Sequence, residues 1–348
     1  VDNDGNGWID DIHGWNFVFN TNQSEPVGSD RHGTSVAGVA AARGDNGVGV
    51  VGGAYQSQLI SIKMFDGSNV AADADIASAL RYAAGIKASG TGTWTAGDVV
   101  NNSWGGGASS PAINSALVDG TTIGRRGIGA AYFFATGNDF ATTVSQPAAQ
   151  SGSIPGVIAV GATNNRGGRS NYSNYGPEVD IVAPSSDGRA GYLRIDTTDR
   201  TGADGYAGGD YTGTGGTGFG GTSSATPLST GIGALALAQA DALGVTIRPN
   251  DLRLLTRNST DLIGGVTYDI NTGKNIEFGY GRINAAALLR GIGNPAISVV
   301  NTTTELVSGS TLNMGSTTTG QFVETTLRIR NQGTQNLVIN SIDVPAPF

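Results

Sequence analysis

Short β-rich runs alternate with Ala-rich runs of helical period from Trp15 to about Leu289. This alternation constrains the fold most, because strands joined by helices form βαβ units whose strands pair in parallel. We therefore predict an α/β fold with a mainly parallel sheet flanked by helices. The expected strands are 59–64, 99–103, 132–136 and 157–161, and the expected helices are 32–43, 73–88, 111–126, 223–243 and 250–258.

Two parts of the chain depart from this pattern. Residues 185–220 are rich in Gly, Tyr, Asp and Thr and have little periodicity, which predicts a long surface excursion. After residues 291–295 the sequence becomes Thr/Val/Asn-rich and alternating, which is typical of β-sandwich strands. We expect strands at 305–307, 325–329 and 337–339. The residues after 295 have room for only about four strands, which is few for a closed β-sandwich. We therefore expect that they form only part of a module.

Composition excludes several classes of protein. Charged residues make up 14% of the chain, whereas about 25% is usual, and a disordered chain needs high charge. The 20 Lys and Arg against 28 Asp and Glu give a net charge of −8 without a basic run, which argues against nucleic-acid binding. The absence of Cys excludes disulfides, thiolate nucleophiles and Cys-ligated zinc.

Targeting features are absent from the sequence as given. Its apolar stretches are all shorter than the roughly 20 residues of a membrane helix, and the polar start at Val1 is no signal peptide. Two interpretations remain open: a cytosolic protein, or a protein whose targeting segment is not part of this sequence.

His13 and His32 are the only histidines, so any imidazole chemistry uses one of them. His32 lies where a polar loop turns into an Ala-rich helix, and a helix start is a rigid position for a general base. Taken alone, such a histidine is more often a capping or surface residue.

A serine and an asparagine occupy two further junctions. Ser223 follows Gly220 and Gly221 and begins an apolar helix, where exposed N–H groups stabilise negative charge. Asn138 follows the expected strand 132–136, and its amide is a candidate donor to an oxyanion. Each has a simpler interpretation: an N-cap serine in one case and a turn-forming asparagine in the other.

Taken together, these segments resemble the subtilisin-like serine proteases, or subtilases. The resemblance covers nearly all of residues 8–289, and its motifs occur in the order of the family. The stretch 102–105 is most similar to the kexin-like branch. The matching segments are 32–38 (His-Gly-Thr-Ser-Val-Ala-Gly), 101–106 (Asn-Asn-Ser-Trp-Gly-Gly), 135–138 (Ala-Thr-Gly-Asn), 157–162, 170–176, 182–184, 221–227 (Gly-Thr-Ser-Ser-Ala-Thr-Pro) and 279–286.

The resemblance implies a three-layer subtilisin-like fold and a role for each matching residue. Ser223 would attack the scissile carbonyl, and His32 would accept its proton and pass it to the leaving amine. Asn138, with the Ser223 N–H, would stabilise the oxyanion. The substrate would pair as an extended strand with Ser103, Trp104 and Gly105, with Gly137 also in contact.

The family's triad also contains an aspartate in an apolar strand well upstream of the histidine, and this sequence has no such segment before His32. Asp30 is only two residues away and would have to fold back on its own helix start. We therefore expect that the sequence starts downstream of the aspartate strand, and that a complementing N-terminal fragment is a plausible partner. Without that carboxylate, turnover falls about 10⁴-fold, so residues 1–348 alone are expected to be nearly inactive.

Two loops are candidate structural calcium sites. Asp2, Asp4, Asn6 and Asp10 occupy positions 1, 3, 5 and 9 of an EF-hand-like loop, although His13 replaces the glutamate expected at position 12. The alternative is a surface turn rich in Asp and Asn. The second loop, 44–50, resembles a calcium loop of subtilases, in which Asn46 would be the side-chain ligand.

We therefore expect a peptidase domain over residues 1–291, N-terminally incomplete, and a partial immunoglobulin-like β-sandwich module over 295–348. The leading hypothesis is a serine endopeptidase that is secreted or attached to the cell surface, as the resemblance implies. A catalytically silent scaffold that binds peptides or calcium is the alternative, because the aspartate is absent. The module's expected role is to anchor or target the enzyme.

Overall fold

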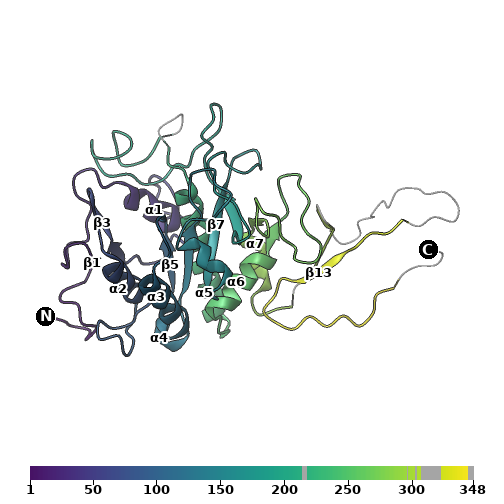
Figure 1. The fold of residues 1–348 in the computed structure, drawn as a ribbon, viewed down its shortest axis with the longest axis horizontal. Helices are drawn as coiled ribbons and strands as arrows, with labels where there is room; N and C mark the ends of the chain where they lie inside the picture. The colour runs from purple at the N-terminus through teal and green to yellow at the C-terminus, as the bar shows by residue number, and fades with distance from the viewer. Residues whose placement is uncertain (214–217, 296, 302–303, 307–322, 344–348) are drawn as a thin grey trace.

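The computed structural model describes residues 1–213, 218–295, 297–301, 304–306 and 323–343. Its largest sheet has six strands, in the order β5-β6-β7-β8-β10-β9. Two of these strands, β5 and β7, are labelled in Figure 1. The first five strands in this order run parallel, and β9 pairs antiparallel with β10. The strands are β5 (Val99–Asn102), β6 (Ala131–Ala135), β7 (Val157–Thr163), β8 (Ile181–Pro184), β9 (Thr260–Asp261) and β10 (Arg282–Ile283). The predicted α/β class is confirmed.

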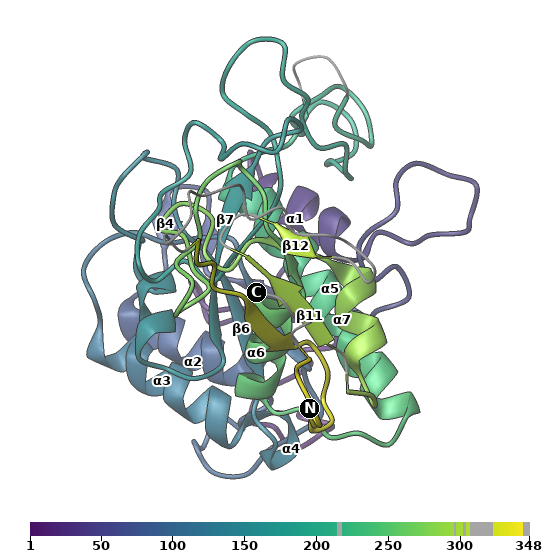
Figure 2. The same ribbon diagram turned by 90° about the vertical axis from the view of Figure 1, so that its right-hand side faces the viewer.

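Helices cover both faces of this sheet. Figure 2 shows α2 (Asp73–Ala83) and α3 (Pro111–Thr122) on one side and α5 (Thr222–Ala242) and α7 (Ala285–Gly291) on the other. The remaining helices are α1 (His32–Ala41), which packs on α5, α6 (Pro249–Asn258), the short α4 (Gly124–Gly127) and the 3₁₀ turn η1 (Ala148–Gly152). The three layers follow from this arrangement.

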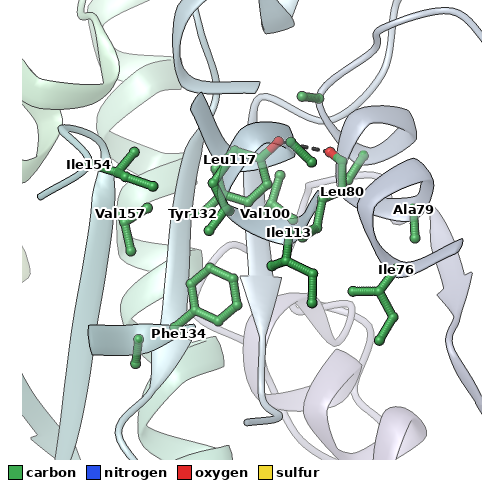
Figure 3. Packing of buried hydrophobic residues seen from close by; sticks show 14 of the residues in the cluster. Ile76, Ala79, Leu80, Val100, Ile113, Leu117, Tyr132, Phe134, Ile154 and Val157 are labelled. Atoms are coloured by element: carbon green, nitrogen blue, oxygen red, sulfur yellow. Dashed lines mark hydrogen bonds between the residues drawn. The ribbon is translucent and has the colours of Figure 1, made fainter. Parts of the chain in front are cut away.

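The central strand β6 explains how one sheet forms two cores. Its side chains alternate between the faces, so Tyr132 and Phe134 belong to one hydrophobic cluster and Phe133 to the other. On the first face the Tyr132 hydroxyl donates to the carbonyl of Leu80 in α2 at 2.8 Å (Figure 3). All three rings are fully buried.

A second pair of parallel strands lies beside the large sheet. β1 (Gly14–Asn16) pairs with β2 (Ser61–Lys63), and the hairpin β3 (Phe65–Asp66) with β4 (Asn69–Val70) follows. Within the described residues, β2 has no second partner and β5 pairs only with β6. Each of these strands therefore has one unpaired edge.

The expected excursion 185–220 is confirmed in its described part, which has no helix and only isolated bridges. It does not project freely. Thr197 and Thr198 donate through their hydroxyls to the carbonyls of Ser35 and Thr34, at 2.9 and 2.8 Å. The excursion is thereby held against the first turn of α1.

Several expected helices end earlier than predicted, for local reasons. α2 ends at Ala83 rather than 88 because Gly85, at φ +76°, turns the chain out of the helix. α3 ends at Thr122 rather than 126 because Arg125 and Arg126 adopt positive φ angles. α1 ends at Ala41, two residues before its predicted end, and α5 and α6 lie within a residue of their predicted bounds.

The C-terminal region forms a three-stranded antiparallel sheet in the order β12-β11-β13. Its strands are β11 (Ile297–Val300), β12 (Glu305–Leu306) and β13 (Arg328–Asn331). The predicted strand at 337–339 is wrong: these residues form no ladder, and Val338 is 74% exposed. An alternating run without a partner strand or a covered face does not form a sheet. The two domain boundaries stay predictions.

None of the helices in the described part of the chain is both long and apolar enough to cross a lipid bilayer.

Candidate active site

The carboxyl ends of β6 and β8 and the start of α5 meet at one edge of the sheet. Ser185, directly after β8, donates through its hydroxyl to the Gly221 carbonyl at 2.8 Å, and its Oγ lies 2.6 Å from the Ser224 hydroxyl. The Gly221 N–H donates to the Tyr172 hydroxyl at 3.1 Å. Gly221 has φ +77°, which favours glycine, and these bonds fix the turn from which α5 begins.

Asn138 is held by the first residue of α5. Its Oδ1 accepts two hydrogen bonds from Thr222, from the backbone N–H at 2.8 Å and from the hydroxyl at 3.0 Å. The side chain is thus oriented without being buried, since Asn138 is exposed. Its Nδ2 has no acceptor among the described residues and lies at the start of α5, 3.2 Å from the position that a Cβ on Gly221 would take.

Gly137 has a conformation and an environment that only glycine fits. Its φ is +109°, and an added Cβ would lie 2.3 Å from Asn174 Nδ2 and 2.4 Å from Ser145 Oγ. Asn174 also supports the loop that follows, because its Oδ1 accepts the N–H groups of Asp139 and Ala141 at 2.8 and 3.0 Å. The backbone around Asn138 is therefore rigid.

Ser223 and Ser103 exchange two hydrogen bonds. The Ser103 hydroxyl donates to the Ser223 carbonyl at 3.0 Å, and the Ser223 hydroxyl donates to the Ser103 carbonyl at 3.3 Å. The first bond anchors the second residue of α5 to the segment after β5. In the second, the Ser223 hydroxyl is directed to a carbonyl and not to an imidazole. The Ser223 N–H lies in the first helical turn, where no intrahelical acceptor exists.

His32 is the first residue of α1 and lies near the same edge. Its ring meets the edge of Phe219, which precedes α5, with centroids 5.4 Å apart. Because α1 and α5 pack together, with Ala40 and Gly231 in contact, the first turns of both helices lie in the same region. His32 is exposed on one side, and partial desolvation by the surrounding protein lowers its pKa below the usual 6.5. Its imidazole has no hydrogen bond to any other described residue.

The carboxylate of Asp30 does not pair with the imidazole of His32. It lies 3.1 Å from the ammonium of Lys63 and accepts the Gly67 N–H at 2.9 Å. Its charge is therefore neutralised at the β2–β3 junction, as expected for an aspartate too close in sequence to orient the imidazole. Among the described residues, no other carboxylate pairs with His32 either.

The segment 103–105 follows β5. It contacts Ser223 through Ser103 and two aromatic rings through Trp104. The Trp104 ring lies 5.6 Å from Phe134 and 6.3 Å from Phe65, centroid to centroid, and its Nε1–H donates to Asn102 at 3.0 Å. Gly105 is exposed and carries no side chain, which leaves its backbone accessible.

The first candidate calcium loop folds around a fully buried Asn6. Asp2 and Asp4 both accept the Asn6 N–H at 3.1 Å, and the Asn6 side-chain amide donates to Asp4 and to Asp11 at 3.1 and 2.9 Å. Asp10 points elsewhere, since its carboxylate pairs with the ammonium of Val1 at 2.9 Å. Asp11 thus approaches the cluster more closely than Asp10 does.

The charges of this loop are unbalanced. Burial raises the pKa of Asp4, and the nearby carboxylates of Asp11 and Asp2 add to that effect. Burial also acts to raise the pKa of Asp2, but the N–H donors of Gly7 and Asn6 outweigh it and lower the pKa. In the described part of the chain, three or more acidic or histidine side chains nowhere converge as a complete metal site. The donor set fits a hard cation only in part.

The second calcium loop also uses its side chain internally. The Asn46 Oδ1 accepts the Val48 N–H at 3.0 Å, and Asn46 is exposed. Its carboxamide is therefore engaged in its own turn.

The structure adds supporting residues that the sequence alone did not assign. Thr222 orients Asn138, Tyr172 and Ser185 hold Gly221, and Phe219 contacts His32. For Thr222 and Phe219, the one indication in the sequence was that they lie close to Ser223, within the same Gly-rich turn.

Comparison with known proteins identifies the relatives of this chain. The model of the subtilase family, Peptidase_S8, matches residues 3–281. An extracellular basic protease of Dichelobacter nodosus is 31% identical over 253 residues, which are 70% of this chain and 37% of that protein. A thermophilic serine proteinase of Bacillus sp. strain AK1 is 30% identical over 276 residues, 79% of this chain and 55% of that protein.

Other relatives agree with these. A calcium-dependent protease of Trichormus variabilis is 33% identical over 286 residues, 76% of this chain and 40% of that protein. Among solved structures, a protease of Pseudoalteromonas arctica PAMC 21717 is similar with a TM-score of 0.57 and 26% identity, over 74% of this chain and 70% of that one. This chain spans between about a third and just over a half of the length of these curated relatives.

Proposed function

Because the chain belongs to the subtilase family, we propose that it is a serine endopeptidase with Ser223 as nucleophile, His32 as general base and Asn138 as oxyanion donor. One observation carries the proposal most directly. Asn138 is anchored through its Oδ1 to Thr222, the residue before Ser223, which leaves its Nδ2 as a donor without an acceptor at the start of α5. Two donors next to one hydroxyl are the arrangement that acyl transfer needs.

The proposed reaction has two halves. The Ser223 Oγ attacks the scissile carbonyl while His32 accepts the hydroxyl proton, and the oxyanion is stabilised by Asn138 Nδ2 and the Ser223 N–H. The C–N bond breaks as His32 gives the proton to the leaving amine, and an acyl-enzyme remains. Water, deprotonated by His32, then attacks the ester, and the acid product leaves with the proton returned to Ser223.

We propose that the substrate backbone lies along Ser103, Trp104 and Gly105 and passes Gly137. An extended peptide gains backbone hydrogen bonds from an exposed, side-chain-poor segment. A substrate N–H that donates to the Ser103 carbonyl would replace the Ser223 hydroxyl there and release it for His32. The present bond between Ser223 and Ser103 then belongs to the substrate-free state.

The carboxylate that orients His32 is proposed to come from a complementing N-terminal fragment. The support is that β2 and β5, which belong to two separate sheets with parallel strands, each have one unpaired edge within the described residues. A parallel strand between them would place its carboxyl end at the edge where His32 lies. Residues 1–348 alone should then hydrolyse peptides about 10⁴-fold more slowly than the complemented protein.

A fluorophosphonate probe tests the nucleophile. We expect covalent labelling at Ser223, mapped by mass spectrometry, which is lost in Ser223→Ala and retained in the exposed control Ser153→Ala. The test uses residues 1–348 with and without the complementing fragment. Labelling that survives Ser223→Ala would remove Ser223 from its role.

The alternative function is a catalytically silent scaffold that binds peptides or calcium. Two observations favour this alternative. The Ser223 hydroxyl donates to a carbonyl and not to an imidazole. The imidazole of His32 has no carboxylate partner in the described part of the chain. Failure of the complemented protein to react with the probe, together with measurable peptide binding, would support this alternative.

We further propose that calcium stabilises the loop 2–11 through Asp2, Asp4, Asn6 and Asp10, with Asp11 as an additional ligand; Asp10 would exchange its present pairing with the Val1 ammonium for the cation. The support is the like-charge cluster around Asn6, which a divalent cation would neutralise. Asn46 in the loop 44–50 is proposed as the side-chain ligand of a second site. Calcium here would be structural and would take no part in the reaction.

The remaining proposals concern the whole protein. Relatives named as extracellular proteases support secretion or attachment to the cell surface. We propose residues 1–291 as the peptidase domain and 295–348 as a partial β-sandwich module that anchors or targets it. Deletion of the module should leave peptide hydrolysis unchanged, and a large loss of turnover would contradict this division.

A further inference from the structure

A small cavity lies where the C-terminal sheet meets the main fold, away from Ser223. Its lining includes Arg328 and Arg330 of β13, Val300 of β11, and Tyr268 and Asp269 from the turn before β10. The space measures about 10 Å³. It holds one particle of about the size of a water molecule.

Arg330 is buried there without full hydrogen bonding. The residue is 4% exposed, and its Nη2 donates at 3.4 Å to three acceptors, the carbonyls of Arg257 and Tyr280 and the hydroxyl of Thr260. Its Nη1 is buried and has no acceptor. A buried guanidinium usually satisfies its donors, so the missing acceptor requires an explanation.

Arg328 presents a second donor of the same kind. Its Nη1 is also buried and without an acceptor. The guanidinium packs on Gly273, where an added Cβ would overlap Nη1, so the glycine permits the close approach. Two unsatisfied Nη1 groups on alternate residues of one strand therefore line the same small space.

The positive charge of this pair is offset only in part by protein carboxylates. Neither arginine forms an ion pair among the described residues. Asp269 lines the cavity, and the charge of Arg328 helps to lower its pKa, although its Oδ1 is directed to the N–H and the hydroxyl of Thr272 at 2.7 and 2.8 Å. Glu305 is exposed and acts on Arg330 without forming an ion pair with it.

The wider surroundings add positive charge. The fully buried Asp180 is shared by Arg253 and Arg257, and Lys274 lies over the same tyrosine ring as Arg257. Burial lowers the pKa of Arg330, and the like charge of Arg328 lowers it further. Buried charges are costly unless they are paired.

We propose that this cavity binds a single halide-sized anion, chloride in ordinary solution, held between the Nη1 groups of Arg328 and Arg330. The volume excludes phosphate and sulfate. A water molecule would satisfy the donors without adding negative charge, whereas an anion would do both, so the anion is favoured. The bound ion would fasten β13 to the segment 257–280, independently of the peptidase chemistry.

Bromide identifies the ion directly. Crystals of residues 1–348 soaked in sodium bromide should show an anomalous peak between Arg328 and Arg330, and crystals of Arg330→Met should not. The exposed-site control Arg290→Met should keep the peak. Density for water alone, without an anomalous signal at saturating bromide, would overturn the proposal.

Melting temperature gives a test in solution. At constant ionic strength, replacing sodium gluconate by sodium chloride should raise the Tm of the unmodified chain and of Arg290→Met by about 2–4 °C. Arg328→Met and Arg330→Met, if folded, should show no such increment, whatever their Tm in gluconate. An equal chloride effect in all four proteins would refute a specific site.

Discussion

Asn138 and Thr222 are joined by two hydrogen bonds that end on a single atom, the Oδ1 of the amide, at 2.8 Å from the backbone N–H and 3.0 Å from the hydroxyl. The acceptor end of the amide is therefore fixed, and its donor end is the free one. An exposed asparagine in an ordinary turn would not need two anchors from a residue 84 positions away. The pair gives Asn138 a defined orientation next to Ser223.

Substitution of Asn138 tests this orientation. Asn138→Ala should lower kcat of the complemented enzyme by about 10²–10³ with little change in KM, because the donor acts on the oxyanion of the transition state. The exposed control Asn165→Ala should keep full activity. Steady-state kinetics with a peptide substrate measure both, and an unchanged kcat in Asn138→Ala would exclude the oxyanion role.

Thr222→Val tests the anchor separately. The valine keeps the backbone N–H that donates to Asn138 and loses the hydroxyl, which donates to Asn138 and accepts the Gly137 N–H at 3.3 Å. We expect a loss of kcat that is smaller than that of Asn138→Ala, because one of the two anchors remains. In the background of Asn138→Ala, the same substitution should have no further effect on kcat, since the group it positions is gone. Additive losses would place Thr222 outside this role.

The pH dependence of His32 follows from its surroundings. Partial desolvation lowers its pKa below 6.5, so the imidazole stays neutral, and able to accept a proton, at a pH where a free histidine is already protonated. For residues 1–348 the rate of fluorophosphonate labelling should therefore fall only below pH 6.5. Addition of the fragment with the complementing carboxylate should raise the pH at which the labelling rate falls, because a nearby negative charge favours the imidazolium and so raises the pKa of His32. A fall at or above pH 6.5 in the chain alone would contradict the assignment.

The sequence predicted those parts of the fold that depend on local pattern. The Ala-rich runs became α1, α2, α3, α5 and α6, and the apolar runs became β5, β6 and β7, because periodicity determines which face is buried. The helix ends were less predictable. Arg125 and Arg126 adopt positive φ angles for which their residue types give no sign.

Long-range contacts explain what the sequence could not supply. Thr222 contacts Asn138, 84 positions away, and His32 contacts Phe219, which is also distant in the sequence. Neither contact produces a periodic pattern in the sequence. The short strands β9 and β10 form because β10 pairs with both β8 and β9. Neither strand contains a run of apolar residues from which it could be predicted. The roles assigned to Ser223 and His32 came from the family resemblance rather than from spacing.

Gly137→Ala tests whether the loop before Asn138 is as constrained as its contacts indicate. The added methyl group would overlap Asn174 and Ser145 and force a side chain at φ +109°, so we expect a loss of about 3 kcal/mol or more. The matched control is Gly167→Ala, at φ +79° with nothing within 4 Å, which should lose only about 1–2 kcal/mol of backbone strain. Thermal unfolding compares Gly137→Ala with Gly167→Ala. Equal shifts in Tm would show that the Asn174 side chain moves aside to make room for the added methyl group.

Asp4 provides the test of the calcium proposal. Its pKa is raised in the folded state, so the folded chain binds a proton more readily than the unfolded one, and the ionised carboxylate opposes folding at neutral pH. Without calcium, stability should therefore rise as pH falls through that raised pKa, and Asp4→Asn should increase Tm at pH 7. With calcium the order should reverse, because the cation binds the ionised cluster and stabilises the native chain by mass action. Asp241→Asn, an exposed substitution far from the loop, is the control for general charge effects. If calcium shifts the Tm of Asp4→Asn and of the unmodified chain equally, Asp4 is not a ligand.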